Sequence, residues 1–293
     1  MKFATVLFGL LNFLPGYRNI TCCVGFIIPH LSNSASIISK CQKNAIRNSE
    51  IVKSYGWLDN FLPAPIEQDD SKRRKEYPEQ YSATYELNKK ILPEDGGREE
   101  FAIARKLLKQ TMLEERPLQI VYDTNQHDWD AASFHRCVDG KGAAIVMVTY
   151  KRDNVIKIVG GYNPKGWSSN GGARPSVAAF LFYEIDHEGD SHEKIFQKLQ
   201  KVGGGGLACA RDDPDYGISF GPDALVISLQ EGREKMATSN LGPYYERGPD
   251  NISTLFAKGA QSASLESIQV LTGIYDEEEE IPYSGAVLDM TSG

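Results

Sequence analysis

The chain has 293 residues, of which 24% are charged, and its 32 basic and 39 acidic side chains give a net charge of −7 at pH 7. Binding to a phosphate backbone needs clustered lysine and arginine, so this net negative charge argues against nucleic-acid binding through the overall electrostatic field of the protein. The five cysteines include no Cys-x-x-Cys pair and no His/Cys spacing suited to zinc, which argues against a disulfide scaffold and a structural zinc site.

The amino-terminal part of the chain has the composition of a targeting segment. Residues 1–49 contain basic residues but no Asp or Glu, whereas a folded domain of mixed charge rarely runs this far without an acid. The apolar run Phe3–Leu14 has the length of a signal-peptide core and is too short to span a bilayer. The serine-containing stretch Ser32–Ser39 that follows is typical of a transit peptide.

A hydrophobic signal followed by a transit-like stretch resembles the two-part presequence of algae whose plastids lie inside the secretory system. We therefore expect residues 1–49 to be a targeting presequence and the mature protein to lie in the plastid (chloroplast). The alternatives are a mitochondrial presequence, or a secretory signal and linker that lead to the endomembrane system. Val24–Ile28 is too short for an anchor, so we expect no stable membrane span in the mature chain.

Residues 50–95 are expected to be a linker that is disordered together with the presequence. Four prolines lie among charged and aromatic residues in this stretch. The basic cluster Lys72–Lys75 is flanked by acidic residues, so it is interpreted as a solvated segment, with a docking or targeting patch as the alternative.

The folded domain is expected to span residues 96–276 and to begin with an amphipathic helix. Glu99–Leu113 places apolar residues on one helical face (Phe101, Ala104, Leu107, Leu108 and Met112). Arg105, Lys106 and Lys109 fall on the remaining surface, and Pro117 ends the helix. The spacing therefore predicts a helix that packs on the rest of the domain.

After this helix the hydrophobic period shifts towards two. The expected strands are Leu118–Tyr122, Ala144–Tyr150, Val155–Tyr162, Val177–Ile185, Ala224–Leu229 and Ser267–Tyr275. Lys151–Asn154 predicts a hairpin turn, and Asp128 or Asp130 is expected to cap a short helix at Ala131–Val138 that stops at Asp139-Gly140. This pattern predicts an α+β, mainly β fold: a two-sheet antiparallel β-sandwich with a few peripheral helices.

Several glycine-containing segments are interpreted as folding devices. Gly160-Gly161 lies within an expected strand and predicts either a bulge or a close backbone approach. Phe220–Asp223 predicts a turn that leads into a strand.

Six segments in order carry a resemblance to a known family. They are Asp128–Gly142, Val159–Trp167 (with Gly-Gly-Tyr followed by Trp), Ala179–Phe182, Ser219–Leu225, Ser239–Glu246 and Leu265–Val270. Their order, from about residue 99 to residue 275, resembles the TLDc domain of the oxidation-resistance protein family. The departures are the Gly203–Gly206 run and an insertion around Asp186–Val202.

The resemblance implies a two-sheet β-sandwich and a role in protection against oxidative damage. For several members it also implies association with the vacuolar-type proton ATPase, which conflicts with a plastid address because that pump lies in endomembranes. No active site is carried over, because no catalytic mechanism is established for the family.

The residues themselves provide few candidates for chemistry. Glu246, Glu266 and His135 are the candidate catalytic residues, but no local spacing brings them together. Ser133 and His135 are two residues apart on one helix, so their side chains diverge. No cofactor and no metal site are expected, and residues 277–293 are expected to be a solvated acidic tail.

Trp129 and Trp167 are the candidate partner-binding residues. An exposed tryptophan would mark a partner surface and a buried one would belong to the core, and we expect one of the two to be core. The leading interpretation is a non-enzymatic protein that protects against oxidative stress by binding a partner protein. An uncharacterised enzyme that uses the carboxylate and histidine groups, and a regulator of the proton ATPase, remain the alternatives.

Overall fold

The computed structural model describes residues 70–89, 97–174, 176–186, 194–202 and 210–284, and the expected presequence lies outside them. Within these ranges the helices are α2 (Asp70–Glu76), α3 (Glu99–Leu107) and α4 (Ala131–Val138), with 3₁₀ turns η2 (Pro78–Gln80) and η5 (Pro249–Asn251). None of the described helices is both long and apolar enough to cross a membrane. The strands are β1 (Leu118–Asp123), β2 (Ala144–Arg152), β3 (Val155–Asn163), β4 (Ala173–Arg174), β5 (Phe180–Glu184), β6 (Phe196–Gln200), β7 (Ala210–Arg211), β8 (Ile218–Phe220), β9 (Leu225–Ile227), β10 (Met236–Thr238) and β11 (Ser262–Gly273).

The strands pair antiparallel in the order β4-β7-β8-β9-β10-β11-β2-β3-β5-β6, and β1 also pairs with β11. β11 joins the two halves of this order, because residues 262–264 pair with β10 while residues 265–272 pair with β2. The expectation of a mainly β, antiparallel fold with few helices is confirmed. The finer expectation of two separate sheets is not confirmed, because the hydrogen-bonded order is continuous through β11.

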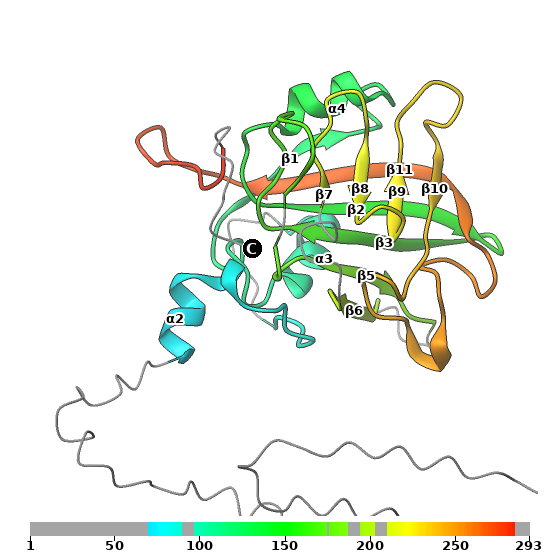
Figure 1. Cartoon of the computed structure of the whole chain (residues 1–293), viewed down its shortest axis with the longest axis horizontal. Helices are drawn as coiled ribbons and strands as arrows, with labels where there is room; N and C mark the ends of the chain where they lie inside the picture. Colours follow the sequence, from blue (N-terminus) through cyan, green and yellow to red (C-terminus); the bar gives the residue numbers. More distant parts are fainter. Residues whose placement is uncertain (1–69, 90–96, 175, 187–193, 203–209, 285–293) are drawn as a thin grey trace, which may run out of the picture. The chain divides into compact units, whose positions relative to one another are not determined.

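The two halves of the strand order pack face to face. Figure 1 shows β8, β9 and β10 crossing over β2 and β3. One core cluster takes Val146 and Val159 from β2 and β3, and Phe220 and Ile227 from β8 and β9. Fully burying such a side chain contributes roughly 1.5–3 kcal/mol, so this contact is a principal source of stability.

A second core cluster forms on the opposite face of β2, β3 and β5. Phe101, Ala104 and Leu107 of α3 pack there against inward residues of the strands, among them Ile145 and Phe182. The alternation along each strand sends neighbouring side chains to opposite faces, so both clusters draw on the same strands. The predicted docking of this helix on the domain is confirmed.

The glycine pair in β3 marks a place where neighbouring groups lie very close to the strand backbone. A Cβ atom on Gly160 would lie 1.9 Å from the carbonyl oxygen of Val146, and one on Gly161 would lie 2.7 Å from the Phe220 ring. Both glycines stay in the regular ladder, opposite Met147 and Val146. Of the two alternatives that the sequence left open, the structure therefore selects the close approach over the bulge.

The local predictions for α4 and for the β2–β3 hairpin are confirmed. The Asp130 carboxylate accepts a hydrogen bond of 2.8 Å from the Ser133 amide and so caps α4. Gly140 follows the helix at φ 71°, a conformation that favours glycine. Asp153 and Asn154 form the hairpin turn at φ 50° and 64°, as a two-residue loop between twisted strands requires.

Helix α3 is shorter than the predicted helix Glu99–Leu113 and ends at Leu107. Arg105, expected on the polar surface, is instead only 2% exposed. Its guanidinium donates to the carbonyl oxygens of Leu113 (2.7 Å), Glu114 (2.8 Å) and Arg116 (3.0 Å). These three bonds turn the chain back across the helix end, so the apolar pattern that continues to residue 112 does not remain helical.

The segment Asp186–Val202, expected to be an insertion between strands, contains the strand β6. Leu199 lies opposite Leu181 of β5, so β6 extends the sheet by one strand. The pattern Phe-Gln-Lys-Leu-Gln has too few apolar or β-branched residues to indicate a strand on its own.

Candidate functional site

His135 lies at a junction of three segments and both of its ring nitrogens are engaged. Nδ1 lies 2.8 Å from Asp139 Oδ1 on the same helix and 3.1 Å from the Ser169 hydroxyl. Nε2 lies 2.8 Å from the carbonyl oxygen of Tyr216. In serine hydrolases the serine and the carboxylate lie at opposite nitrogens of the histidine, whereas here both lie at Nδ1. This geometry does not let His135 transfer a proton between Ser169 and Asp139.

The surroundings of His135 favour its charged form. The carbonyl oxygen at Nε2 can only accept, and the carboxylate at Nδ1 accepts as well, so an imidazolium satisfies both. Burial lowers the pKa of His135, but the hydrogen bonds with Asp139 and with the Tyr216 carbonyl outweigh it and raise the pKa above its ordinary value. Both ring nitrogens therefore donate hydrogen bonds, and the ring joins α4 to the segment that precedes β8.

The neighbouring connection between β3 and β4 is held by a buried carboxylate. Asp212 is 1% exposed and accepts hydrogen bonds from the amides of Ser168 (2.7 Å), Ser169 (2.9 Å) and Asn170 (3.1 Å). The Trp167 indole nitrogen donates to the carbonyl oxygen of Arg211 at 3.1 Å. No local pattern in the sequence points to Asp212, because its partners lie more than forty positions earlier in the chain.

The two candidate partner-binding tryptophans lie in different environments. Trp167 is fully buried and meets the rings of Phe134 and Phe220 edge to face, so it is a core residue and does not belong to an exposed partner surface. Trp129 is only partly buried, and Lys235 Nζ lies 5.4 Å from its ring centroid. Only Trp129 therefore remains available to a partner.

The structure does not bring the candidate catalytic residues together. Glu266 is exposed at the irregular position of β11 between Leu265 and Ser267. Glu246 accepts hydrogen bonds from the Gln200 amide (2.9 Å) and from the Tyr85 hydroxyl (2.5 Å). No contact within the described part of the chain joins Glu246, Glu266 and His135 to one another.

Tyr85, whose hydroxyl donates to Glu246, belongs to a segment that was expected to be a linker. Residues 83–88, which we call the strap, contain no helix or strand, yet the domain holds them at five points. The Tyr85 hydroxyl donates to Glu246, and the Glu86 carboxylate pairs with Lys109. The remaining bonds use the strap's main chain: the Gln200 side chain donates to the Ala83 carbonyl, Lys198 to the Glu86 carbonyl (3.1 Å), and the Asn88 amide to the Lys106 carbonyl (2.6 Å).

Lys198 is the most unusual group beneath the strap. It is 1% exposed, points from β6 to the helix side of the sheet, and lies 4.8 Å above the Phe180 ring. Burial lowers the pKa of Lys198 to about 7, because the ammonium loses its water shell there. Lys198 carries no signal in the sequence by itself, because the surrounding segment Asp186–Val202 was expected to be an insertion.

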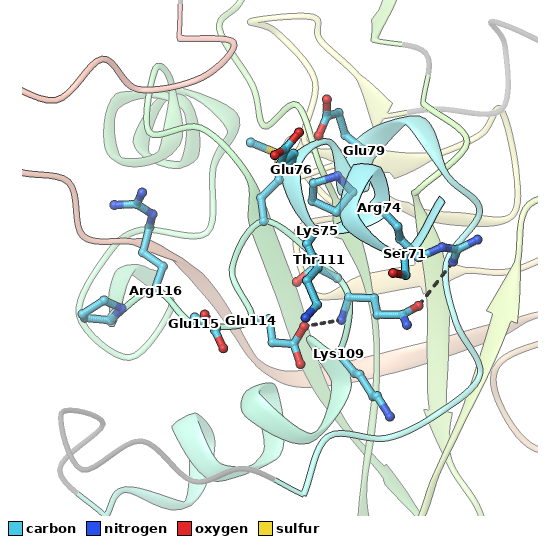
Figure 2. Close-up of a pocket in the computed structure, with 14 residues that line it drawn as sticks. Ser71, Arg74, Lys75, Glu76, Glu79, Lys109, Thr111, Glu114, Glu115 and Arg116 are labelled. Carbon is cyan, nitrogen blue, oxygen red and sulfur yellow. Dashed lines mark hydrogen bonds between the residues drawn. The ribbon is translucent and has the colours of Figure 1, made fainter. Parts of the chain in front are cut away.

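A groove adjoins the strap. Figure 2 shows it between α2 with η2 on one side and the connection 109–117 on the other, and its volume is about 1070 Å³. Arg74 donates to the Gln110 side chain (3.2 Å), and the Gln110 amide donates to Glu114 (2.8 Å). Lys109 lines the groove and also binds Glu86 of the strap, so the two features are continuous.

The groove carries both signs of charge. Its lining includes Arg74, Lys75, Lys109 and Arg116 together with Glu76, Glu79, Glu114 and Glu115. Arg116 forms an ion pair with Glu279 at 2.5 Å, and its guanidinium lies over the Tyr275 ring. The described start of the expected acidic tail is therefore held at the edge of the groove. A lining of this kind suits a polar protein surface and lacks the clustered positive charge that a phosphate backbone requires.

Among the described residues no group of three or more His, Cys, Asp or Glu could hold a metal ion. Cys137 is a free, partly buried thiol on α4 that packs against the core between the two halves of the strand order.

One comparison with known proteins identifies a family. The family model for the TLDc domain matches residues 98–248, which is more than half of the chain. No curated protein matches the chain. The matched range runs from α3 to the segment after Glu246 and so includes the His135 junction, Asp212 and Lys198. On this match the chain belongs to the TLDc-domain family.

Proposed function

We propose that this TLDc-domain protein protects against oxidative damage by binding a partner protein, and that it does not act as an enzyme. The family is commonly linked to resistance against oxidative stress, which supports the protective role. The absence of enzymatic activity is supported by His135, because its two ring nitrogens are hydrogen-bonded to Asp139 and to the Tyr216 carbonyl. A general base needs a nitrogen that is free to accept a proton from substrate.

The candidate carboxylates fit the same proposal. Both oxygens of Glu246 accept hydrogen bonds from the protein, and Glu266 is exposed to solvent. A catalytic carboxylate pair works because the two groups face one substrate from fixed positions. Glu246 lies in the connection after Tyr245 and Glu266 lies in β11, and they have different neighbours, so they are better suited to structural and surface roles.

The experiment combines survival with turnover. Cells that lack this protein are complemented with the wild-type chain or with Glu266→Gln, and their survival in peroxide is measured. The purified full chain is assayed with peroxide and with ester and peptide substrates. We expect restored survival and no turnover. Turnover that is lost in His135→Asn, Glu246→Gln or Glu266→Gln at an unchanged melting temperature would instead establish an enzyme.

The site of action follows from the presequence. We propose that residues 1–49 direct the protein to the plastid, because this stretch lacks acidic residues and pairs a hydrophobic signal with a transit-like segment. The full chain with a carboxyl-terminal fluorescent tag should colocalise with plastids, and sequencing of the mature amino terminus should reveal cleavage. An endomembrane signal would contradict this address and would make the vacuolar-type proton ATPase the first partner to test.

A further inference from the structure

The strap is bound to the domain as a peptide ligand would be. The groups that hold it are Lys106, Lys109, Lys198, Gln200 and Glu246, and all of them lie inside the family-matched range 98–248. The strap itself, residues 83–88, lies before that range. The domain therefore provides the receptor surface, and an extension of the chain occupies it.

We propose that this surface is a docking site for an extended segment of a partner protein, and that the strap occupies it within the same chain until the partner displaces it. The inference rests on the proposed function, since it assumes that the protein acts through a partner. The partner segment has the chemistry of the strap: a small residue, any residue, a tyrosine and an acidic residue in succession, as in Ala83-Thr-Tyr-Glu86.

The contacts define what the surface recognises. Gln200 and Lys198 bind two main-chain carbonyls of the strap, at Ala83 and Glu86, and such contacts give affinity for an extended chain regardless of its sequence. Selectivity comes from three side-chain contacts. Ala83 is 8% exposed against the helix-side core, so only a small side chain fits there. The Tyr85 hydroxyl donates to Glu246, and the Glu86 carboxylate pairs with Lys109.

The strap is suited to release. Tyr85 is 51% exposed and Glu86 is exposed, so the apolar packing of the strap comes from the buried Ala83 and the partly buried Leu87. Lys198 is a buried amine that donates to the strap, and burial of a charged amine is costly, so a strap that leaves Lys198 to water gives up less stability than its contacts suggest. Glu86, Lys109 and Glu114 are the charged groups around it, and they include both signs.

The test uses the full chain and a labelled peptide of residues 79–89. The strap is opened by Ala83→Arg, whose side chain does not fit the buried site, or by the milder double variant Tyr85→Phe with Glu86→Ala. Binding is measured by fluorescence anisotropy. We expect an opened chain to bind the peptide at least about tenfold more tightly than the wild-type chain, whose own strap competes at a high effective concentration.

Two matched changes address the tyrosine contact. A peptide that carries Tyr85→Phe should bind the opened chain about tenfold more weakly, the loss expected for a hydrogen bond to a charged acceptor. Glu246→Gln in the opened chain should weaken binding of the tyrosine peptide and should leave binding of the phenylalanine peptide unchanged. If Ala83→Arg does not fold, the double variant carries the measurement.

The outcomes separate the two proposals. An opened chain that keeps its melting temperature and binds no peptide overturns the docking site, even if cells are still protected from peroxide. Peptide binding together with absent protection would leave the docking site in place and overturn the proposed function. If opened chains instead form dimers that the peptide cannot dissociate, the occupant is a second copy of this chain, and the proposal of a different partner is overturned.

Discussion

Single buried polar side chains join segments that are distant in this sequence. Arg105 holds the carbonyls of residues 113, 114 and 116, Asp212 holds the amides of residues 168–170, and Lys198 holds the strap. A buried polar group that loses its partner costs about 1–3 kcal/mol. Substitutions of Arg105 and Asp212 are therefore expected to alter stability first and function only through it, whereas Lys198 also contributes directly to the proposed docking surface.

His135→Gln should remove a pH-dependent part of the stability. Burial lowers the pKa of His135, but Asp139 and the Tyr216 carbonyl outweigh it, so the folded-state pKa lies above the unfolded value of about 6.5. The contribution of the imidazolium is then complete below about pH 6.5 and is lost as the pH rises through the folded-state pKa. The difference in melting temperature between wild type and variant should shrink from about pH 5.5 to about pH 8.5. His127→Gln is the matched control, and a difference that grows with pH would contradict the assignment.

Lys198→Met should show the opposite trend with pH. Burial lowers the pKa of Lys198 to about 7, so the unfolded chain, with an ordinary lysine pKa near 10.4, binds more protons between these values. The stability of the wild type relative to the variant should therefore rise from about pH 7 to about pH 10. Lys141→Met, which changes an exposed lysine, is the control for general charge effects. If stability changes with pH in the same way for the wild type and for Lys198→Met, Lys198 is not desolvated in solution.

At the scale of elements, the ends of helices and the spacing of layers are decided by contacts between elements. α3 ends where Arg105 turns the following connection, and this connection forms one wall of the groove. At its glycine pair β3 lies against the backbone of β2 and the Phe220 ring of β8. Two predictions follow from these contacts.

Arg105→Met should destabilise the domain by about 3 kcal/mol or more, because three carbonyl oxygens lose their donor at a buried site. The apolar side chain replaces part of the packing, so the loss reports chiefly on the hydrogen bonds. Denaturant titration measures the change in free energy of unfolding. A loss below about 1 kcal/mol, similar to that of an exposed substitution, would contradict the role of Arg105 in shaping the groove wall.

Gly160→Ala should destabilise the domain more strongly than Gly161→Ala. The new methyl group at Gly160 would meet a main-chain oxygen at 1.9 Å, whereas at Gly161 it would meet the Phe220 ring at 2.7 Å. A side chain can shift more readily than a strand backbone, so Gly161→Ala should cost about 1–3 kcal/mol and Gly160→Ala more than this. Melting temperatures of the two variants test the order, and equal effects would contradict the close approach to Val146.

At the scale of the whole molecule, β11 joins the two halves of the strand order, since it pairs with β10, β2 and β1. The core between the halves takes side chains from both, so neither half retains its buried surface without the other. This arrangement predicts unfolding of the domain as one unit.

Calorimetry on the full chain should therefore show a single transition whose calorimetric and van't Hoff enthalpies agree. Leu265→Ala at the point where β11 changes partners should lower the midpoint of that transition without splitting it, because Leu265 belongs to the shared core. Two resolved transitions in the wild-type chain would contradict the coupling through β11.

The sequence by itself determined the features that depend on neighbouring residues. The mainly β class, the limits of α4, a cap at Asp128 or Asp130 and a hairpin turn within Lys151–Asn154 all follow from periodicity and turn chemistry within a few positions, and the structure selects Asp130 as the cap. The ordered motif segments likewise predicted the TLDc family that the family model matches.

Only the tertiary structure decided the features that depend on distant partners. It placed Trp167 rather than Trp129 in the core, separated Glu246 from Glu266, ended α3 at Leu107 and held the strap on β6. Tyr85 and Glu246 are 161 positions apart, and Lys198 and Glu86 are 112 apart. A local pattern specifies how a segment folds, whereas desolvation and hydrogen bonding across such separations specify what that segment contacts, and these are set only when the chain has packed.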